Sequence, residues 1–363
     1  MSYAAILSSR QARRPCGTDT WVQQTVRAVN TLAETGATIV SSVGMQTWEL
    51  VTAMAALREV PLYLIVPSES IEEFEREKEW IEHEFGMSHD RVIFESTYDL
   101  SNFDDTDPQI SRDLAVIQRA DRLLPISIRP EGNMAQTLKV AEQTGRQVIR
   151  DFQIDYQARE NPVAYSVSPD RIRPELDSLG GEYLIHWTRA SNGPWPGERR
   201  VEYYRDVASS SRYPRTAFDS LTQILRTGRI MGSPRHMPAN TPTVSMTGLS
   251  PTACIPLMRW RARYGEMSFE PYGIGISRKL AEQIDIKPVE YYDDPANPPP
   301  GVDLWRTQFK GTKTDWRQEN EYRFRGDFDF SSISRDAVVA FCLNHDEARQ
   351  IETQFGVRAI SFY

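Results

Sequence analysis

Two loops in the first half of the chain combine glycine with small polar side chains, a composition that suits phosphate binding. The segments Thr38–Met45 and Ile126–Asn133 each join an apolar run to a helical pattern. Such a turn points backbone N–H groups at one spot, and the N-terminus of the following helix favours an anion there. Two of these turns in one parallel sheet would frame a nucleotide-sized pocket. The predicted pocket residues are Ser41, Ser42, Gly44, Glu49, Arg129, Gly132 and Asn133.

These seven residues have different expected roles. Hydrogen bonds to the ligand are expected from Ser41, Ser42, Arg129 and Asn133. Glu49 either accepts a hydrogen bond from a ribose hydroxyl or is a charge on the first turn of a helix. The alternative for Gly44 and Gly132 is that they permit tight turns and nothing more.

Strand and helix patterns alternate through the first 150 residues. Strands are expected at Ala4–Leu7, Thr38–Ser41, Leu62–Val66, Val92–Phe94, Arg122–Ile128 and Gln147–Ile149. Helices are expected after Thr18 and at Trp48–Leu57, Ser70–Phe85, Ile110–Ala120 and Met134–Thr144. This alternation predicts an α/β domain with a doubly wound, Rossmann-like parallel sheet over residues 1–150. Ligands of such sheets bind beyond the carboxyl ends of the strands, where both loops lie.

The two loops also carry a family resemblance. Ser41-Ser42-Val43-Gly44 is similar to the Ser-Gly-Leu-Ala turn of the DNA-processing protein A family, with Glu49 near that family's acidic position. Glu131–Thr137 stands where the family has a Ser-Gly-Ser-Leu turn and a Thr-Ala-rich helix. Ser42 takes the place of a usual glycine. Residues 1–150 thus resemble the Rossmann-like domain of this family and of the wider SLOG superfamily, which includes lysine-decarboxylase-like nucleotide hydrolases. The resemblance implies nucleotide binding.

The second half of the chain changes character after a proline-containing joint. Pro162, Pro169 and Pro174 interrupt any long helix, so residues 151–182 are predicted to be a linker. Residues 183–363 are predicted to form an α+β domain with more strand than helix. Its polar candidates for chemistry are His186, Arg189, Ser245, Thr247, Arg259, Arg261, Tyr272, Glu319 and Glu321.

The order of short motifs in this half is similar to a bacterial domain family associated with abortive phage infection. The matching motifs are His186-Trp187-Thr188, Ile224–Gly228, Pro271-Tyr272-Gly273-Ile274, Pro288-Val289-Glu290-Tyr291 and Trp316–Arg323. Each motif is short, so the specificity lies in their order. The resemblance implies a role in phage defence or DNA modification.

The same order also resembles that of ADP-ribosyltransferases. That family presents an early Arg or His, a central Ser-x-Ser/Thr strand and a late Glu-x-Glu. The matching residues are His186 or Arg189, Ser245-Met246-Thr247 and Glu319-Asn320-Glu321. The resemblance implies NAD as a substrate, with one carboxylate holding a ribose hydroxyl and stabilising an oxocarbenium-like state while a basic side chain holds the pyrophosphate. A second carboxylate two residues earlier would accept a proton, because Trp316–Phe324 is predicted to be a half-buried strand with Glu319 and Glu321 on one face.

Each of these assignments has a structural alternative. Glu321 can instead be paired with an arginine on a solvated strand face. His186 can be a core histidine that donates to a backbone carbonyl. Cys254 and Cys342 lie in apolar surroundings and are expected to be packed thiols rather than nucleophiles.

A basic and aromatic cluster follows in the sequence Arg259-Trp260-Arg261-Ala262-Arg263. Its arginines can grip a phosphate or a nucleic-acid backbone. With Trp260 between them they can also stack on and pair with an unpaired strand. The alternative is a network of surface ion pairs in an acidic protein.

The composition narrows the function classes. The chain has 363 residues, of which 40% are hydrophobic and 25% charged, and its net charge is −8. This balance suits a globular protein with two domains and argues against non-specific coating of duplex DNA. We expect no membrane span, no signal peptide, a cytoplasmic location and no zinc site, since the cysteines and histidines are scattered. A homo-oligomer is compatible with the sequence.

The preferred hypothesis is a cytoplasmic enzyme that acts on a nucleotide or on a base in nucleic acid. Its partners would be a nucleotide or single-stranded or modified DNA, and NAD would be a substrate of ADP-ribosyltransferase-like chemistry. One alternative is hydrolysis of a substituent on a modified deazaguanine in DNA, which needs no NAD. Another is a non-catalytic nucleotide sensor or DNA-binding module of a defence system.

Overall fold

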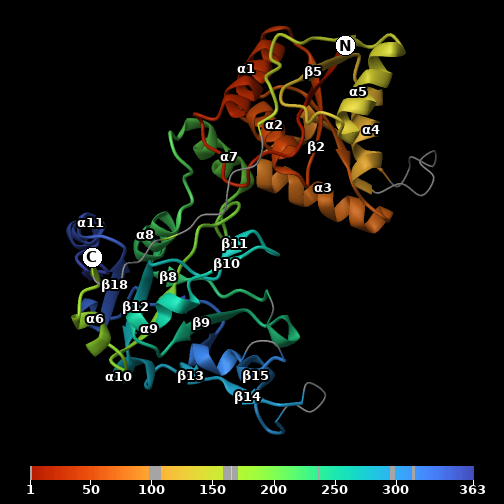
Figure 1. The fold of residues 1–363 in the computed structure, drawn as a ribbon. Coiled ribbons are helices and arrows are strands. Elements are labelled where there is room, and N and C mark those ends of the chain that lie inside the picture. Colours follow the sequence, from red (N-terminus) through yellow and green to blue (C-terminus); the bar gives the residue numbers. More distant parts are fainter. Residues whose placement is uncertain are drawn as a thin grey trace. The chain divides into compact units, whose positions relative to one another are not determined.

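The computed structural model describes residues 2–97, 108–157, 165, 171–235, 237–294, 299–312 and 315–363. The chain forms two compact units (Figure 1). Unit 1 comprises Met1–Asn161 and Asn192–Pro214, and unit 2 comprises Pro162–Ser191 and Arg215–Tyr363. This division differs from the predicted boundaries, because residues 192–214 leave the second half of the chain and return to the first unit. No helix among the described residues is long and apolar enough to cross a membrane.

Unit 1 is built on a six-stranded sheet in which every pairing is parallel. Its strands are β1 (Tyr3–Leu7), β2 (Thr38–Ser42), β3 (Leu62–Val66), β4 (Val92–Ser96), β5 (Arg122–Pro125) and β6 (Gln147–Val148). They lie in the order β4-β3-β2-β1-β5-β6. The chain therefore moves outward from β1 to β4 and then crosses to the other side of β1. The predicted parallel α/β sheet is confirmed, and its strand order reverses between β1 and β5.

Helices pack on both faces of this sheet. They are α1 (Thr20–Glu34), α2 (Gln46–Leu57), α3 (Ile71–Phe85), α4 (Pro108–Arg119) and α5 (Asn133–Gln143). Alternate side chains of β1 face opposite ways, as in any strand. Ile6 belongs to the apolar cluster that includes Trp21 and Val22 of α1, whereas Leu7 belongs to the cluster that includes Val116 of α4. This two-sided burial explains why β1 and β3 are apolar throughout.

A helix from the returning segment completes unit 1. Helix α7 (Arg200–Ser209) contributes Tyr203, Tyr204 and Val207 to the apolar cluster formed with α1 and α2. The two tyrosine rings meet edge to face with centroids 4.8 Å apart. Because these side chains are almost fully buried, the segment cannot stay in the second unit without exposing them. This burial is the physical reason for the unexpected boundary.

Unit 2 contains a seven-stranded, mostly antiparallel sheet. In spatial order its strands are β13 (Lys287–Pro288), β16 (Glu321–Arg325), β9 (Thr243–Thr247), β7 (Tyr183–Trp187), β12 (Gly273–Ser277), β18 (Val338–Cys342) and β19 (Arg358–Ser361). Only the last pair, β18 and β19, is parallel among these described pairings. A Cβ atom on Gly273 would lie 2.7 Å from the Trp187 ring, so glycine is required there by close packing. The predicted α+β architecture of this half is confirmed.

Shorter elements surround this sheet. They are α6 (Glu175–Ser178), α8 (Ala217–Thr227), β8 (Arg229–Ile230), α9 (Pro251–Cys254), β10 (Trp260–Arg261), β11 (Glu266–Met267), α10 (Arg278–Ala281), β14 (Glu290–Tyr292), β15 (Thr307–Phe309), β17 (Phe328–Asp329) and α11 (His345–Phe355). Helix α8 ends at Gly228 in the left-handed conformation, as its sequence predicts.

One predicted strand is wrong in its first half. Residues Trp316–Glu319 form a 3-10 turn rather than a strand. Asn320 then adopts a left-handed conformation with φ 44°, and β16 begins only at Glu321. Glu319 and Glu321 therefore do not share a strand face. Asparagine tolerates this conformation better than most residues, and it lets the chain turn sharply into the sheet.

Candidate functional sites

The first predicted loop of unit 1 uses its serines inside the protein. Both Ser41 and Ser42 are fully buried. The hydroxyl of Ser41 lies 3.0 Å from that of Thr52 on α2, and the hydroxyl of Ser42 donates to the Ile65 carbonyl at 2.6 Å. These bonds tie β2 to α2 and to β3. The two side chains thus position the loop.

Glu49, on the first turn of α2, is hydrogen-bonded to the same loop. Gly44 has φ 82°, and its N–H donates to Glu49 Oε1 at 3.2 Å. The other carboxylate oxygen accepts from Arg200 at 2.7 Å and from the Tyr204 hydroxyl at 2.8 Å. Burial, and next the Glu49 charge, raise the pKa of Tyr204, so its hydroxyl keeps its proton. The loop therefore holds an anion of its own, and Glu49 is bonded to α7.

The second predicted loop leaves its helix N-terminus uncapped. Gly132 stands at the N-cap of α5, and no side chain among the described residues caps this end. Glu131 just before it has φ 58°, which bends the chain sharply. Arg129 and Asn133 are exposed at the same edge. The first N–H groups of a helix have no partner within it, so this end can accept an anion.

A third loop, which the sequence analysis did not single out, is bonded to the second. It follows β1, beside β5 at the point where the strand order reverses. Ser9 N–H donates to the Ser127 carbonyl at 2.9 Å, and Arg129 N–H donates to the Ser9 hydroxyl at 2.9 Å. Gln11 donates to the carbonyls of both Ser9 and Ser127. Arg10, exposed, belongs to the same loop.

Two buried hydroxyls lie where these strands end. The Oγ atoms of Ser8 and Ser127 have no hydrogen-bond partner among the described residues. Ser8 is 5% exposed and Ser127 is 1% exposed. Unpaired buried hydroxyls are uncommon because each costs free energy. The signal that could have revealed this loop is the run Ser8-Ser9-Arg10 directly after an apolar strand at the centre of the sheet.

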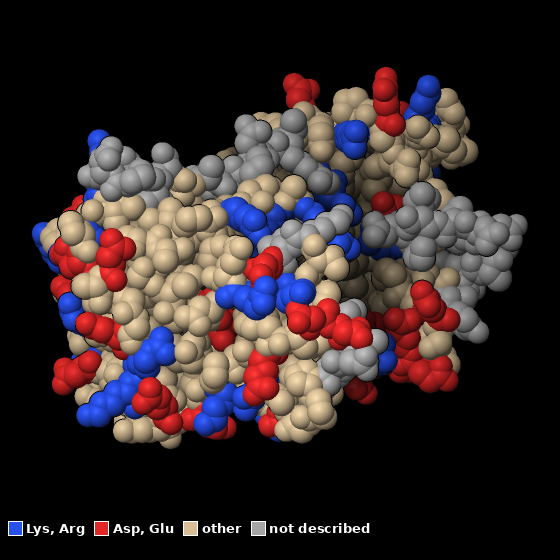
Figure 2. All heavy atoms as spheres, turned by 60° about the horizontal axis from the view of Figure 1, so that its bottom comes forward, with Lys and Arg blue, Asp and Glu red and all other residues tan. Residues whose placement is uncertain are grey.

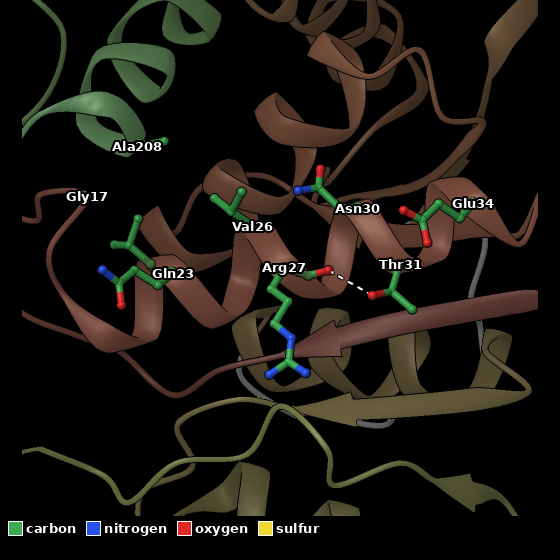
Figure 3. Close-up of a pocket in the computed structure, with 9 residues that line it drawn as sticks. Gly17, Gln23, Val26, Arg27, Asn30, Thr31, Glu34 and Ala208 are labelled. Atoms are coloured by element: carbon green, nitrogen blue, oxygen red, sulfur yellow. Dashed lines mark hydrogen bonds between the residues drawn. The ribbon is translucent and has the colours of Figure 1, made fainter.

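A shallow groove of about 430 Å³ runs along another part of unit 1 (Figure 3). It follows the outer face of α1, where Gln23, Arg27 and Thr31 succeed one another. Gly17 and Ala208 line its other side. None of the seven predicted nucleotide-site residues lines it. The groove is thus separate from the loops at the carboxyl ends of the strands.

In unit 2, polar side chains on three neighbouring strands form a continuous chain of hydrogen bonds. His186 on β7 bonds through Nδ1 to the Ser245 carbonyl on β9, at 2.9 Å. The Ser245 hydroxyl donates to Glu321 Oε1 on β16, at 2.7 Å. Because a carbonyl can only accept, His186 Nδ1 carries the hydrogen and Nε2 remains an acceptor. The antiparallel pairings β7–β9 and β9–β16 bring these three residues together.

Glu321 is held by an arginine that the sequence analysis did not assign. Arg323 donates through Nε to Glu321 Oε1 at 2.9 Å and through Nη2 to Oε2 at 3.0 Å. The same guanidinium donates to the carbonyls of Trp305 and Thr307. The side chains of Arg323 and Glu321 are 2% and 13% exposed. The arginine pair expected as the structural alternative therefore exists, but it is buried rather than solvated.

Glu319 lies near the same carboxylate from the preceding 3-10 turn. Its backbone carbonyl accepts from the Thr247 hydroxyl at 2.6 Å, which fixes the turn to β9. Burial raises the pKa of the Glu319 carboxyl, and Glu321 raises it further, while Arg261 and Arg259 oppose the shift. Only Asn320 separates the two residues along the chain, although they do not share a strand face.

The tyrosine at position 291 borders this acidic pair. Its hydroxyl is buried and has no hydrogen-bond partner among the described residues. Burial raises the pKa of Tyr291, and the charge of Glu321 raises it further. An unpaired hydroxyl beside a carboxylate is a donor available to a ligand. Tyr291 lies in the motif Pro288-Val289-Glu290-Tyr291, but the spacing of that motif alone indicates no role for it.

Arg189, which the sequence predicts as a basic group of the site, shares an acidic partner with Arg235. Arg189 is 3.4 Å from Glu266 Oε1, and Arg235 approaches the same oxygen at 3.4 Å. Burial lowers the pKa of Arg189; Glu266 opposes this, and Arg235 and Arg261 lower it further. Burial also lowers the pKa of His186, a shift that the bond to Ser245 opposes and Arg189 reinforces. His186 is therefore neutral at pH 7.

Two predicted residue groups lie apart from this cluster. Tyr272 donates its hydroxyl to Glu347 on α11 at 3.0 Å, and no described contact joins it to His186 or Glu321. Cys254 and Cys342 are both fully buried, and burial raises the pKa of Cys254 to about 12. Both cysteines are thus packed thiols, as their apolar surroundings predict. The described residues contain no group of histidine, cysteine and acidic side chains that could hold a metal ion.

Comparison with known proteins finds similarity in fold for the N-terminal part. No family model and no curated protein sequence matches the chain. DNA processing protein A from Helicobacter pylori, described for its single-stranded DNA binding mode, is 17% identical over 40% of this chain and 63% of its own, with a TM-score of 0.29. The Streptococcus pneumoniae protein is 14% identical over 41% and 49%, with a TM-score of 0.30.

A structural-genomics target, TM1055, is 14% identical over 42% of this chain and 76% of its own, with a TM-score of 0.29. The chain thus spans less than two thirds of the two DNA-processing proteins. The three matches cover 40%, 41% and 42% of this chain. The resemblances of residues 183–363 stay predictions.

Proposed function

We propose that unit 2 transfers ADP-ribose from NAD, with Glu321 as the central carboxylate. The observation that carries this proposal is the hydrogen-bonded series His186, Ser245 and Glu321 on three neighbouring strands. These residues stand in the order that ADP-ribosyltransferases present along the sequence, and the fold makes them adjacent. A second carboxylate, Glu319, lies beside Glu321.

Each side chain of the site would have a separate role in this reaction. The bond between the nicotinamide nitrogen and the ribose carbon breaks, and nicotinamide leaves with the bonding electrons. Glu321, oriented by Ser245 and Arg323, accepts a hydrogen bond from a ribose hydroxyl and stabilises the positive charge that develops on the ribose. The acceptor then bonds to the ribose carbon and gives its proton to Glu319.

Other groups would bind the rest of the substrate. Arg189 is the candidate for the pyrophosphate, as the sequence predicts, and Arg235 joins it because both approach Glu266. A pyrophosphate would relieve the repulsion between these cations. Neutral His186 presents Nε2 as an acceptor for a hydroxyl of the substrate. Ser245 and Thr247 hold Glu321 and the Glu319 turn in place.

The direct test is release of nicotinamide when the full chain is incubated with NAD. We expect release in the presence of protein or nucleic-acid acceptors and transfer of labelled ADP-ribose to one of them. A chain that neither consumes NAD nor transfers label with any acceptor would overturn this function. Hydrolysis of a substituent on a modified deazaguanine requires no NAD, so activity that survives removal of NAD favours that alternative.

The reaction should depend on pH through Glu319. A base works only when deprotonated, and burial together with Glu321 raises the pKa of Glu319. We therefore expect the rate of transfer to fall on the acidic side with an apparent pKa above the usual glutamate value. Removing a neighbouring cation by Arg261→Gln should move this limb to still higher pH, since Arg261 lowers the pKa of Glu319.

The measurement is the pH profile of kcat for the wild type and the Arg261→Gln variant. Arg226→Gln is the matched control because Arg226, on α8, is exposed and is not among the groups that shift the pKa of Glu319. A limb that does not move in Arg261→Gln, or that moves to lower pH, contradicts the assignment of Glu319 as the base.

Unit 1 is proposed to bind a nucleotide through its phosphate at the edge formed by the loops after β1 and β5. The uncapped N-terminus of α5 and the bonds between Ser9 and Arg129 support this location. Asn133 would contribute its N–H group, with Arg129 and Arg10 as cations. Gly132 would shape the turn, because its own N–H donates to the Arg129 carbonyl at 3.2 Å. The loop after β2 would then shape the pocket wall, since its donors Ser41, Ser42 and Gly44 are bonded internally.

Substitution of the two cations should weaken this binding. We expect the double variant Arg10→Gln and Arg129→Gln to lower the affinity for AMP or ATP by about tenfold or more, since each charged hydrogen bond is worth roughly 1.5–3 kcal/mol. Isothermal titration calorimetry measures the change. Arg58→Gln is the control, because Arg58 is exposed at the C-terminal end of α2. Equal affinities for the double variant and the wild type would show that the nucleotide does not bind at this edge of the sheet.

A further inference from the structure

The hairpin formed by β10 and β11 concentrates positive charge within an acidic chain. Arg259 precedes β10, Arg261 lies within β10, and Arg263 lies in the turn between the two strands; Arg259 and Arg263 are exposed. Trp260 pairs with Met267 and Arg261 with Glu266 across the hairpin. Figure 2 shows several Lys and Arg side chains next to one another, with Asp and Glu side chains among them. The net charge of the whole chain is −8, so a concentration of arginine in one hairpin differs from the charge of the chain as a whole.

The hairpin arginines are not paired with acidic groups. Within the part of the chain that the structure describes, none of Arg259, Arg261 and Arg263 forms a salt bridge. Many arginines elsewhere do, for example Arg119 with Glu95 and Arg173 with Glu175. Among the described residues, these three side chains therefore do not form the network of ion pairs expected as the structural alternative. Their charges remain available to an anionic partner.

Aromatic rings accompany these charges. The Arg261 guanidinium lies 5.7 Å from the centroid of the Trp316 ring. The guanidinium groups of Arg235 and Arg263 lie 5.6 and 5.7 Å from the Tyr264 ring. Cations bind phosphates, and the half-buried aromatic rings that alternate with them stack on unpaired bases. A duplex offers phosphates but keeps its bases stacked inside.

The same side chains adjoin the carboxylates of the proposed reaction. Trp316 and Glu319 belong to one 3-10 turn. Arg261 and Arg259 are close enough to Glu319 to lower the pKa of its carboxyl. A strand bound along the hairpin would therefore pass beside Glu319, which is proposed to take the proton of the acceptor.

We propose that the β10–β11 hairpin, with Trp316 and Tyr264, binds single-stranded nucleic acid and presents it as the acceptor to Glu319 and Glu321. The hairpin arginines hold the phosphates, and the aromatic rings stack on unpaired bases. The role as acceptor rests on the proposed function of unit 2, whereas the binding itself does not. The two can therefore be tested separately.

The test measures binding of labelled single-stranded DNA and RNA oligonucleotides of about 12 nucleotides to the full chain without NAD, by fluorescence anisotropy. We expect the triple variant R259Q/R261Q/R263Q to lose at least about tenfold in affinity. Its salt dependence should weaken by about 2 in the slope of log K against log salt, because three phosphate contacts disappear. The control R226Q/R349Q/R358Q removes the same charge from exposed arginines on α8, α11 and β19 and should bind normally.

Three results would overturn this inference. The first is a wild-type chain that binds neither DNA nor RNA, and the second is a hairpin variant that binds as tightly as the control. The third is equal binding of a strand without bases, which would make the surface a plain polyanion site. Whether DNA or RNA binds more tightly decides the acceptor. Failure of NAD turnover would leave the binding result unchanged, so the failures of the two proposals are distinguishable.

Discussion

Replacement of Glu321 by glutamine is expected to lower kcat/KM for NAD by about 10²–10³-fold or more. Glutamine keeps the size of the side chain but removes the negative charge that would face the developing oxocarbenium ion. It also leaves Arg323 without its ionic partner in a buried position, where the arginine is 2% exposed. Both effects reduce turnover, so the rate has to be measured together with whether the variant remains folded.

The control for this experiment is Ser245→Ala. It removes one hydrogen bond to Glu321 Oε1 but leaves the carboxylate and its pair with Arg323 intact. A hydrogen bond to a charged group contributes about 1.5–3 kcal/mol, so a loss of roughly tenfold to a hundredfold is expected. Nicotinamide release measures the rate, and hydrogen exchange of the β16 amides shows whether the strand remains ordered. Wild-type turnover by a folded Glu321→Gln protein would exclude Glu321 from the chemistry.

The second large effect is one of stability. Replacing Arg323 by methionine should lower the free energy of unfolding of unit 2 by about 3–5 kcal/mol, because it leaves a buried carboxylate without its partner. It also removes the bonds that tie β16 to the carbonyls of Trp305 and Thr307 and to Gln308. The measurement is urea dependence of hydrogen exchange in β16 and β9, since two units need not unfold in one step.

A neighbouring residue supplies the matched control. Arg325 lies on the same strand but is exposed, so Arg325→Met should change the stability by less than about 0.5 kcal/mol. The double variant E321Q/R323M should recover part of the loss because it leaves no buried charge unpaired. If Arg323→Met and Arg325→Met were equally stable, the buried pair would contribute nothing to the fold of unit 2.

The sequence predicts the first unit well at the level of elements. Its central strands β1 and β3 are apolar and its helices follow a 3.6-residue period, so their alternation indicates a parallel sheet before any contact is known. The sequence predicts less well which hydrogen-bond donors of the loops are free to bind a ligand. Ser41 and Ser42 read as ligand donors, but their hydroxyls are bonded to Thr52 and Ile65. A hydroxyl looks the same in the sequence whether its partner is a ligand or a neighbouring strand.

The second unit shows the same division in its candidate site. Residue types and order indicated His186, Ser245, Glu319 and Glu321, and three of them form the series across β7, β9 and β16. The sequence did not assign a role to Arg323, although it stands two residues from Glu321 on one strand face. It also read Trp316–Phe324 as one strand, because alternation does not reveal a left-handed residue such as Asn320.

The sequence by itself thus determined the elements, their classes and the residue types available for chemistry, because local periodicity and propensity act over a few residues. Only the tertiary structure decided which polar groups meet, which of them are satisfied internally, and that residues 192–214 belong to unit 1. These decisions depend on strand pairing and burial between segments far apart in the sequence, as in the bond from Tyr204 to Glu49, which lie 155 residues apart. No local pattern carries that information, because the free energy comes from contacts that exist only once the chain has folded.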